Sequence, residues 1–226
     1  MSARKCVLGA LAALAATAVL PVVATAPKAT PIAPDGVTTV EETIEACRES
    51  GLGGWELVDH ATQLVHRKYS HYSCYHWWES PVRSFARSRG QANQYNNVLS
   101  RVLKALGFRV RTVHAARVRL QRSPWWHAGH TWLEVTVDGR TRDVCASRAE
   151  TRAGEVMFIP VSTVRPFRGL TYLDTTLGLA PIVTVLTWRS WIERSPLPRW
   201  MYRPFDEAAS PEGWPGYVSH PMRGER

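Results

Sequence analysis

The chain has 226 residues, of which 45% are hydrophobic and 21% charged, which excludes a wholly disordered protein and suits one globular domain with a leader or tail. The formal net charge of +9 at pH 7 either serves solubility or favours anionic surroundings such as phospholipid, cell-wall polymer or nucleic acid. The sequence has no basic run and no RNA-reading motif, so no nucleic-acid partner is expected and an anionic envelope surface remains a candidate.

The N-terminus has the pattern of an export signal. A basic start, MSARK, precedes a long apolar run without an acidic residue, and small residues close the run. Cleavage is expected after Ala24, because Pro27 disfavours cleavage after Ala26. The alternative is an uncleaved anchor, since the apolar run is nearly long enough to span a bilayer. The sequence therefore predicts a secreted or extracytoplasmic protein, with membrane anchoring as an open alternative.

Export has consequences for the cysteines. Cys6 leaves with a cleaved leader, and Cys47, Cys74 and Cys145 remain. In an oxidising compartment two of these three can pair, and the sequence does not choose the pair. No CxxC or HExxH motif occurs, so no metal site and no cofactor are expected.

The first helices are predicted from their start signals and apolar spacing. Residues 25–37 contain three prolines and are typical of a linker. A capping box at Thr38, Thr39, Glu41 and Glu42 predicts a short helix that ends at the turn beginning with Gly51.

A second helix is predicted over about residues 55–68, because its apolar residues form one stripe. The aromatic segment YSHYSCYHWWESP and a short helical piece at 81–87 follow.

The best-patterned element follows Gly90. Apolar residues recur there at intervals of three and four, which predicts an amphipathic helix that begins at Ala92 and is stopped by Gly107. The apolar positions are Ala92, Tyr95, Val98, Leu99, Val102, Leu103 and Leu106.

Strands are predicted next. Residues 108–120 alternate like a half-exposed strand, and residues 130–144 predict a hairpin whose two-residue turn is Asp138-Gly139. Residues 155–164 are a further candidate strand. Helices followed by a helix packed on an antiparallel sheet indicate an α+β fold.

The C-terminal part contains an apolar segment, GLTYLDTTLGLAPIVTVLTW. Asp174 and Pro181 interrupt it, so a buried or interfacial helix is favoured over a membrane span. The final stretch is rich in proline and is expected to be irregular or partly disordered.

Three of these segments, RGQANQYNNVLSRVLKALGFRVRTV, HTWLEV and DGRTRDV, resemble in this order the core of the transglutaminase-like superfamily, with a more distant echo of arylamine N-acetyltransferases. The resemblance covers about residues 54–147. It implies a papain-like core with a Cys-His-Asp triad that performs acyl transfer or amide hydrolysis. The domain assignment that follows is 1–24 for the leader, 25–37 for the linker, 38–180 for the transglutaminase-like domain, and 181–226 for an apolar helix and Pro-rich tail.

The resemblance assigns the triad positions. The family's nucleophile is a cysteine at the start of the helix, where the helix N-terminus lowers the pKa of the thiol. In this sequence Ala92 occupies that position. His130, followed by Thr131 and Trp132, matches the histidine, and Asp143 is the nearest match for the acid.

The acid departs from the family pattern. In the predicted hairpin Asp143 lies opposite Glu134, on the same face as His130 but ~13 Å along the strand from the position opposite that histidine. Cys145 occupies the place of the family's acid and lies diagonal to His130, at ~7–8 Å.

Two classes of function follow from the missing nucleophile. A methyl group neither attacks a carbonyl nor carries a proton, so the first hypothesis is an exported pseudoenzyme that binds a peptide, a protein or an envelope component. The candidate binding residues are Gln91, Asn93, Asn96, Trp126 and Trp132. The second hypothesis is an active acyltransferase or amidase that uses Cys145 or Cys74 with His130. Contact between a sulfur atom and the His130 imidazole, or a residue 92 far from His130, would contradict the first hypothesis.

A third hypothesis is a membrane-associated structural protein. It is suggested by the leader, by the apolar residues 177–188 and by RSWIERSPLPRW, whose tryptophans and arginines suit a headgroup layer.

Overall fold

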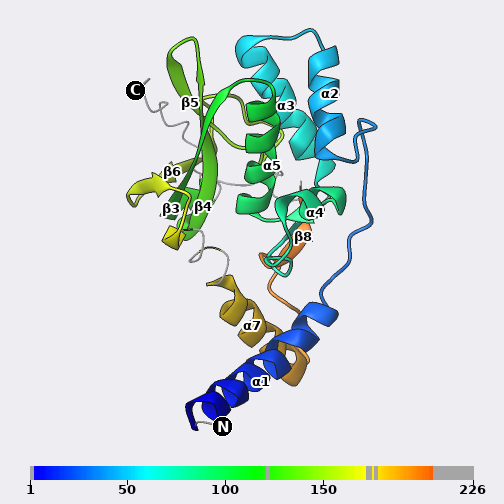
Figure 1. Ribbon diagram of the computed structural model, residues 1–226, viewed down its shortest axis with the longest axis vertical. Helices are drawn as coiled ribbons and strands as arrows, with labels where there is room; N and C mark the ends of the chain where they lie inside the picture. The colour runs from blue at the N-terminus through cyan, green and yellow to red at the C-terminus, as the bar shows by residue number, and fades with distance from the viewer. Residues whose placement is uncertain (1–2, 121–122, 172–174, 176–177, 206–226) are drawn as a thin grey trace.

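The computed structural model describes residues 3–120, 123–171, 175 and 178–205, and gives only the backbone of residues 3–4 and 123–128. The fold is α+β, as predicted, with helices packed on one side of an antiparallel sheet (Figure 1). Its helices are α1 (Ala3–Ala24), α2 (Val40–Glu49), α3 (Gly54–Lys68), α4 (Pro81–Ala86), α5 (Ala92–Ala105) and α7 (Leu179–Glu193).

The larger sheet has the strand order β5-β4-β3-β6, with β7 also pairing with β3. All of its described pairs are antiparallel. The strands are β3 (Arg109–Leu120), β4 (Ser123–Val137), β5 (Arg140–Val144), β6 (Phe158–Pro160) and β7 (Val164–Pro166). The predicted strand at 155–164 is thus a shorter strand, β6, followed by a separate one, β7.

The β4–β5 hairpin has the predicted register. Asp138 and Gly139 both have positive φ, 49° and 77°, as a two-residue turn of the primed kind requires. Glu134 pairs with Asp143, and the ladder ends where Leu133 pairs with Val144. Cys145 therefore lies just beyond the paired part of β5.

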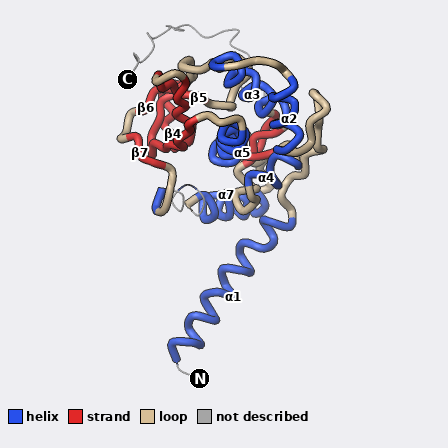
Figure 2. Tube along the Cα trace, turned by 45° about the horizontal axis from the view of Figure 1, so that its top comes forward, coloured by secondary structure: helices blue, strands red, loops and turns tan. Residues whose placement is uncertain are grey.

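Helix α5 lies at the centre of the core. Its residues Val98, Leu99, Val102 and Leu103 are fully buried. Figure 2 shows α5 between the strands of the larger sheet and the helices α2 and α3. The apolar spacing read from the sequence thus places one helix in contact with both layers, and this helix carries Ala92 at its first turn.

A small second sheet joins distant parts of the chain. Its order is β2-β1-β8, with β1 (His71–Ser73) parallel to β2 (Arg89–Gly90) and antiparallel to β8 (Tyr202–Pro204). Phe205, directly after β8, packs in the main core. The chain after residue 180 therefore contributes to the same folded body, and the domain boundary assigned there remains a prediction.

The segment 25–37 is held against the domain by hydrogen bonds at Pro27, Ile32 and Asp35. Arg89 Nη1 donates to the Pro27 carbonyl at 3.3 Å. Ser88 Oγ accepts a hydrogen bond from the Ile32 amide at 2.9 Å, and Arg67 Nε lies 2.8 Å from Asp35 Oδ2.

Helix α1 packs by its last turns against α7. Trp188 Nε1 donates to the carbonyl oxygen of Ala18 at 2.9 Å. A second apolar cluster is formed by Val22, Ala26, Cys74, Tyr75, Val183 and Met201. Among the described residues, the helical segment Lys5–Ala24 is long and apolar enough to cross a membrane, judged by length and composition only.

All four cysteines are free thiols, so the disulfide that the sequence leaves open among Cys47, Cys74 and Cys145 is not formed. Cys74 lies in the second cluster, apart from Cys47 and Cys145 in the main core. The sulfur of Cys145 contacts Asn96, His130 and Ser147.

Candidate functional site

The site begins at the turn that leads into α5. Gly90 is required there, because an added Cβ would collide with Ser84 Oγ and lie 3.1 Å from Gln94 Oε1. Gln91 caps the helix in an extended conformation, and its amide donates to Gln94 Oε1 at 3.0 Å. Ala92 follows as the first helical residue, with 9% of its surface exposed.

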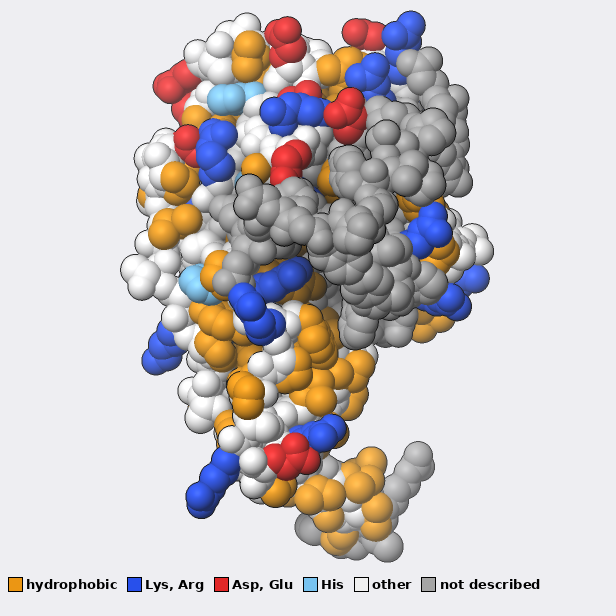
Figure 3. Space-filling view, turned by 180° about the vertical axis from the view of Figure 1, so that it is seen from behind, with side chains coloured by type: hydrophobic (Ala, Val, Ile, Leu, Met, Phe, Trp, Pro, Cys, Tyr) orange, Lys and Arg blue, Asp and Glu red, His pale blue; other side chains and the backbone are white. Residues whose placement is uncertain are grey.

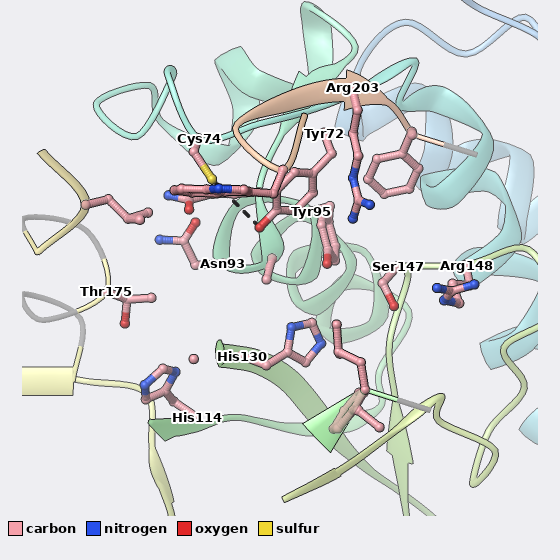
Figure 4. A pocket seen from close by; sticks show the side chains of 18 of the residues that line it. Tyr72, Cys74, Asn93, Tyr95, His114, His130, Ser147, Arg148, Thr175 and Arg203 are labelled. Carbon is pink, nitrogen blue, oxygen red and sulfur yellow. Dashed lines mark hydrogen bonds between the residues drawn. The ribbon is translucent and has the colours of Figure 1, made fainter. Parts of the chain in front are cut away.

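A pocket of about 420 Å³ opens at this end of α5. Ala92 and His130 both line it, so the structure brings together the two positions that the resemblance assigns to the nucleophile and the histidine. Figure 4 shows His130 in this pocket. Gln91 and Asn93 also line it, from the start of the helix.

His130 is in contact with a sulfur atom. Its Nε2 lies 3.3 Å from Cys145 Sγ. Cys145 also receives a hydrogen bond from Asn96 Nδ2 at 3.3 Å and donates its own proton to Ser147 Oγ at 3.2 Å. Because the thiol proton is directed to Ser147, the sulfur acts as the acceptor for an N–H at His130 Nε2, and this hydrogen-bond pattern assigns the tautomer.

Burial keeps both partners of this contact uncharged. It raises the pKa of the Cys145 thiol above its ordinary value. Burial, with a smaller contribution from His114, lowers the pKa of His130 to about 3. At neutral pH the pair is therefore a thiol and a neutral imidazole, whereas a reactive cysteine needs a thiolate. Cys145 is also fully buried.

Asp143 is held by a tryptophan. Its Oδ1 accepts a hydrogen bond from Trp132 Nε1 at 3.0 Å. The Trp132 ring in turn stacks with that of His130, with centroids 6.3 Å apart and planes 12° apart. On this face of the hairpin Trp132 lies between the Asp143 carboxylate and the His130 imidazole. The Nε2 atom of His130 contacts Cys145 Sγ and not the Asp143 carboxylate.

Two of the predicted binding residues have structural roles. Asn96 is fully buried and joins β4 to the segment after β5, since its Nδ2 donates to the Thr131 carbonyl at 2.7 Å and its Oδ1 accepts from the Ala146 amide at 3.0 Å. Trp132 is 1% exposed and belongs to the main core. The side chains of Asn96 and Trp132 make their contacts inside the fold, which corrects the prediction that they contact a ligand. The side chain of Trp126, in β4, lies outside the described residues.

Cys74 lines the pocket without touching His130. Its sulfur lies 4.0 Å from the Tyr72 hydroxyl, and burial raises the pKa of its thiol to about 11. It is therefore a buried, protonated thiol at neutral pH.

Sequence reasoning missed several residues that line the pocket, among them Tyr72, His114, Ser147 and Arg203. Arg203 lies in β8, a three-residue strand. Neither apolar periodicity nor a motif marks so short a strand, so the sequence carries no signal that it approaches α5.

The comparison with family models agrees with the core predicted from the sequence. A sequence model of the transglutaminase-like superfamily matches residues 46–141. No curated protein matches the chain. A solved structure described as "Crystal structure of a TGase" is similar at 13% identity, with a TM-score of 0.39, and the match covers 50% of this chain and 31% of that one. This chain thus spans about a third of the length of that structure. The match of the superfamily model confirms the resemblance read from the sequence: residues 46–141 of this chain are similar to the transglutaminase-like superfamily.

Proposed function

We propose that this chain is an exported transglutaminase-like domain that binds a peptide or an envelope component and lacks the usual cysteine-dependent acyl transfer. The observation that carries the proposal is Ala92 at the first turn of α5, on the wall of the pocket that His130 also lines. A cysteine at a helix N-terminus gains a low thiol pKa and attacks an acyl carbon. A methyl group at this place does neither.

The features that would hold a ligand are still present. The pocket volume of about 420 Å³ is within the range of small-molecule sites. Gln91 and Asn93 supply polar groups at the helix start, and the first turn of α5 has unpaired backbone N–H groups, as every helix does. Binding without covalent chemistry is the function that uses these groups and does not need a nucleophile.

A second candidate function is thiol catalysis by Cys145, and one observation favours it: the 3.3 Å contact between Cys145 Sγ and His130 Nε2, which is the contact expected to contradict a silent scaffold. Two others oppose it. The sulfur is fully buried, and burial raises its pKa, so the thiolate form is disfavoured at neutral pH. The same contact supports a different role, in which Cys145 orients the imidazole from the place of the family's acid.

Reactivity of thiols tests the two candidates. In the parent chain we expect none of the buried thiols, Cys47, Cys74 and Cys145, to react with iodoacetamide rapidly below pH 8, because burial keeps them protonated. In Ala92→Cys the new thiol should be alkylated with a midpoint well below pH 8, measured by mass spectrometry of the labelled peptide. The matched control is Ala92→Cys combined with His130→Ala, which should lose this low-pH reactivity.

The opposite result is equally clear. Rapid labelling of the parent chain at pH 7 that disappears in Cys145→Ser would contradict the binding proposal and establish the catalytic candidate. If the Ala92→Cys thiol behaves as an ordinary thiol, either the catalytic frame around residue 92 has decayed or residue 92 is not the family's nucleophile position, and the latter would contradict the basis of the proposal.

We further propose that α1 stays attached and holds the domain at the membrane. The apolar part of α1 is largely exposed, for example Leu14 at 69% and Leu20 at 63%, whereas Val22 near its end is 2% exposed and packs in the second cluster. Cleavage after Ala24 would remove Val22 from this cluster. An exported protein whose first residue is Thr25 would contradict the anchor and support the leader.

A further inference from the structure

The pocket wall carries a positive charge. Its described lining residues include Arg203 and neither an aspartate nor a glutamate. Arg203 lies in β8, outside the segment 46–141 that matches the superfamily. The charge is therefore an addition of this chain's C-terminal part to the end of α5.

Arg203 is held in place by aromatic rings. Its Cζ lies 5.3 Å from the centroid of the Tyr72 ring, and Figure 4 shows the guanidinium close to Tyr72 and directed toward Tyr95. Burial raises the pKa of both phenols well above their ordinary value, so neither phenol supplies a negative charge to Arg203.

The guanidinium lacks an anionic partner among the described residues. Its Nε is buried and makes no hydrogen bond there. Arg89, in strand β2 of the same small sheet, shows the contrast, since its Nη2 lies 2.9 Å from Glu79 Oε1. Arg203 as a whole is half-buried, but a charged N–H group that is removed from water, as its Nε is, costs free energy unless a partner accepts from it. At Arg203 the place where such an anion would sit opens onto the pocket.

A second donor on the same wall is unused. Gln91 is 4% exposed, and its side-chain Nε2 is buried and has no hydrogen-bond partner in the described part of the chain. It caps α5, whose N-terminal end favours negative charge. Arg203 and Gln91 thus approach the pocket from different elements, and both offer N–H groups that an anion accepts.

We propose that this pocket binds a ligand through a carboxylate, with Arg203 as its ion-pair partner and Gln91 as an additional donor. The proposal rests on the binding function proposed above and names the class of ligand. The apolar lining suits the body of such a ligand, and its members include Leu120, Met157, Phe158, Leu179, Ile182 and Trp200. An acylated amino acid or a peptide with a free C-terminus has this combination of an apolar body and a carboxylate.

The test uses the full chain and a pair of probes that differ only in charge, N-acetylphenylalanine and N-acetylphenylalanine amide. We expect the free acid to raise the thermal midpoint of unfolding and to show binding in calorimetry. The amide should have an affinity lower by about tenfold or more. In Arg203→Gln the acid should lose this advantage over the amide. The matched control is Arg109→Gln, which makes the same change of charge at an exposed position on β3.

A second readout separates ligand binding from a structural role. If Arg203 is unpaired, Arg203→Gln without a probe should melt at the parent's temperature or above it, because it removes an uncompensated charge. A large fall in the thermal midpoint would show a structural arginine and overturn the proposal.

Other results overturn it as well. Equal binding of acid and amide, binding of neither, or undiminished binding of the acid by Arg203→Gln would each remove the carboxylate subsite while leaving the binding function in place. Displacement of the acid by inorganic phosphate at lower concentration than the acid itself needs would assign the subsite to phosphate. Hydrolysis of the amide probe, seen by mass spectrometry, would instead overturn the proposed non-catalytic function.

Discussion

Single side chains at the start of α5 and just after β5 set the chemistry of this pocket. With alanine at 92, His130 has no thiol to deprotonate at the helix start. Its Nε2 meets Cys145 Sγ at 3.3 Å, and the thiol proton is directed to Ser147. The imidazole is thus oriented by a neutral acceptor in the place where the family has a carboxylate, and nothing in this pair favours the charged form.

Acid should therefore destabilise the fold through His130. Burial lowers its pKa to about 3, against about 6.5 in an unfolded chain. Below pH 6.5 the unfolded state takes up a proton that the folded state does not, so stability is fully present above this pH and is lost as pH falls toward 3. Between pH 6 and pH 4 the parent should lose about 1 to 3 kcal/mol more free energy of unfolding than His130→Gln, measured by urea unfolding at each pH.

The protonation state can be observed directly. In ¹⁵N-resolved spectra the ring of His130 should remain neutral at pH 5. A titration midpoint near 6.5, or equal acid sensitivity of parent and variant, would show that the imidazole is hydrated and the pKa ordinary.

Asn96 gives a prediction about stability. Its side chain pairs the Thr131 carbonyl and the Ala146 amide, both of which would be left buried without a partner in Asn96→Ala. Each unsatisfied group costs about 1 to 3 kcal/mol, so we expect a loss of about 3 kcal/mol or more in the free energy of unfolding. The matched control is Asn97→Ala on the same helix, where the side chain bonds only the Asn93 carbonyl of its own helix, and we expect a loss below about 1 kcal/mol. Similar losses in the two variants would refute the bridging role.

At the scale of elements, the approach of β2 to α4 and α5 fixes the start of the site helix. Gly90 ends β2, and its α-carbon lies where a side chain would meet Ser84 and Tyr69. Gln94 then holds the turn, since its Nε2 donates to the carbonyls of His76 and Glu79, both at 2.8 Å. The position of Ala92 on the pocket wall follows from these contacts.

Gly90→Ala should consequently disturb the site and the fold together. We expect a loss of about 1 to 3 kcal/mol or more in the free energy of unfolding, because the new methyl overpacks a closed space. Gly53→Ala is the control, since a Cβ there meets nothing within 4 Å and the residue is not in the left-handed region. Its loss should not exceed about 1 kcal/mol, the difference between glycine and alanine at a helix N-cap. Chemical unfolding of both variants gives the comparison, and an unchanged stability of Gly90→Ala would mean that Ser84 moves aside.

For the whole molecule, the notable surface is the one that α1 and α7 present. Exposed apolar side chains of α7 include Ile182, Val185, Trp188, Trp191 and Ile192. Figure 3 shows apolar side chains gathered toward the end of the molecule at which α1 and α7 lie. A soluble domain rarely exposes such a continuous apolar face, so a bilayer is the surrounding that suits it.

Membrane extraction tests this arrangement. If α1 is an uncleaved anchor, the exported full chain should stay with the membrane fraction after washing with alkaline carbonate. Leu11→Arg combined with Leu14→Arg should release it, because each arginine at the centre of a span costs about 2.5 to 3.5 kcal/mol. Retention in a high-salt wash but release by carbonate would instead indicate a peripheral protein held by α7, and a soluble parent would contradict both.

Much of the fold follows from local sequence patterns. The capping box before α2, the apolar spacing of α5 and the Asp138-Gly139 turn are each encoded by residues close together in the chain, and the structure has all three. The register that places Glu134 opposite Asp143 follows from the turn alone. These features are predictable because their contacts span only a few residues.

The candidate site was predictable only in part. The order of motifs places Ala92 and His130 in one site, and both line the pocket. It does not show that Trp132 donates a hydrogen bond to the Asp143 carboxylate. Nor does it show that the Asn96 side chain is hydrogen-bonded to the backbone of Thr131 and Ala146. Such partners depend on side-chain directions where two elements meet, and periodicity does not report them.

The sequence by itself determined the transglutaminase-like core and the absence of a thiol at the start of its central helix, because residue identity and short-range order encode both. Only the tertiary structure decided that Cys145 touches His130 and that Arg203 reaches the pocket from β8. The physical reason is that both contacts join residues from separate elements, whose approach is set by the packing of the whole chain around α5.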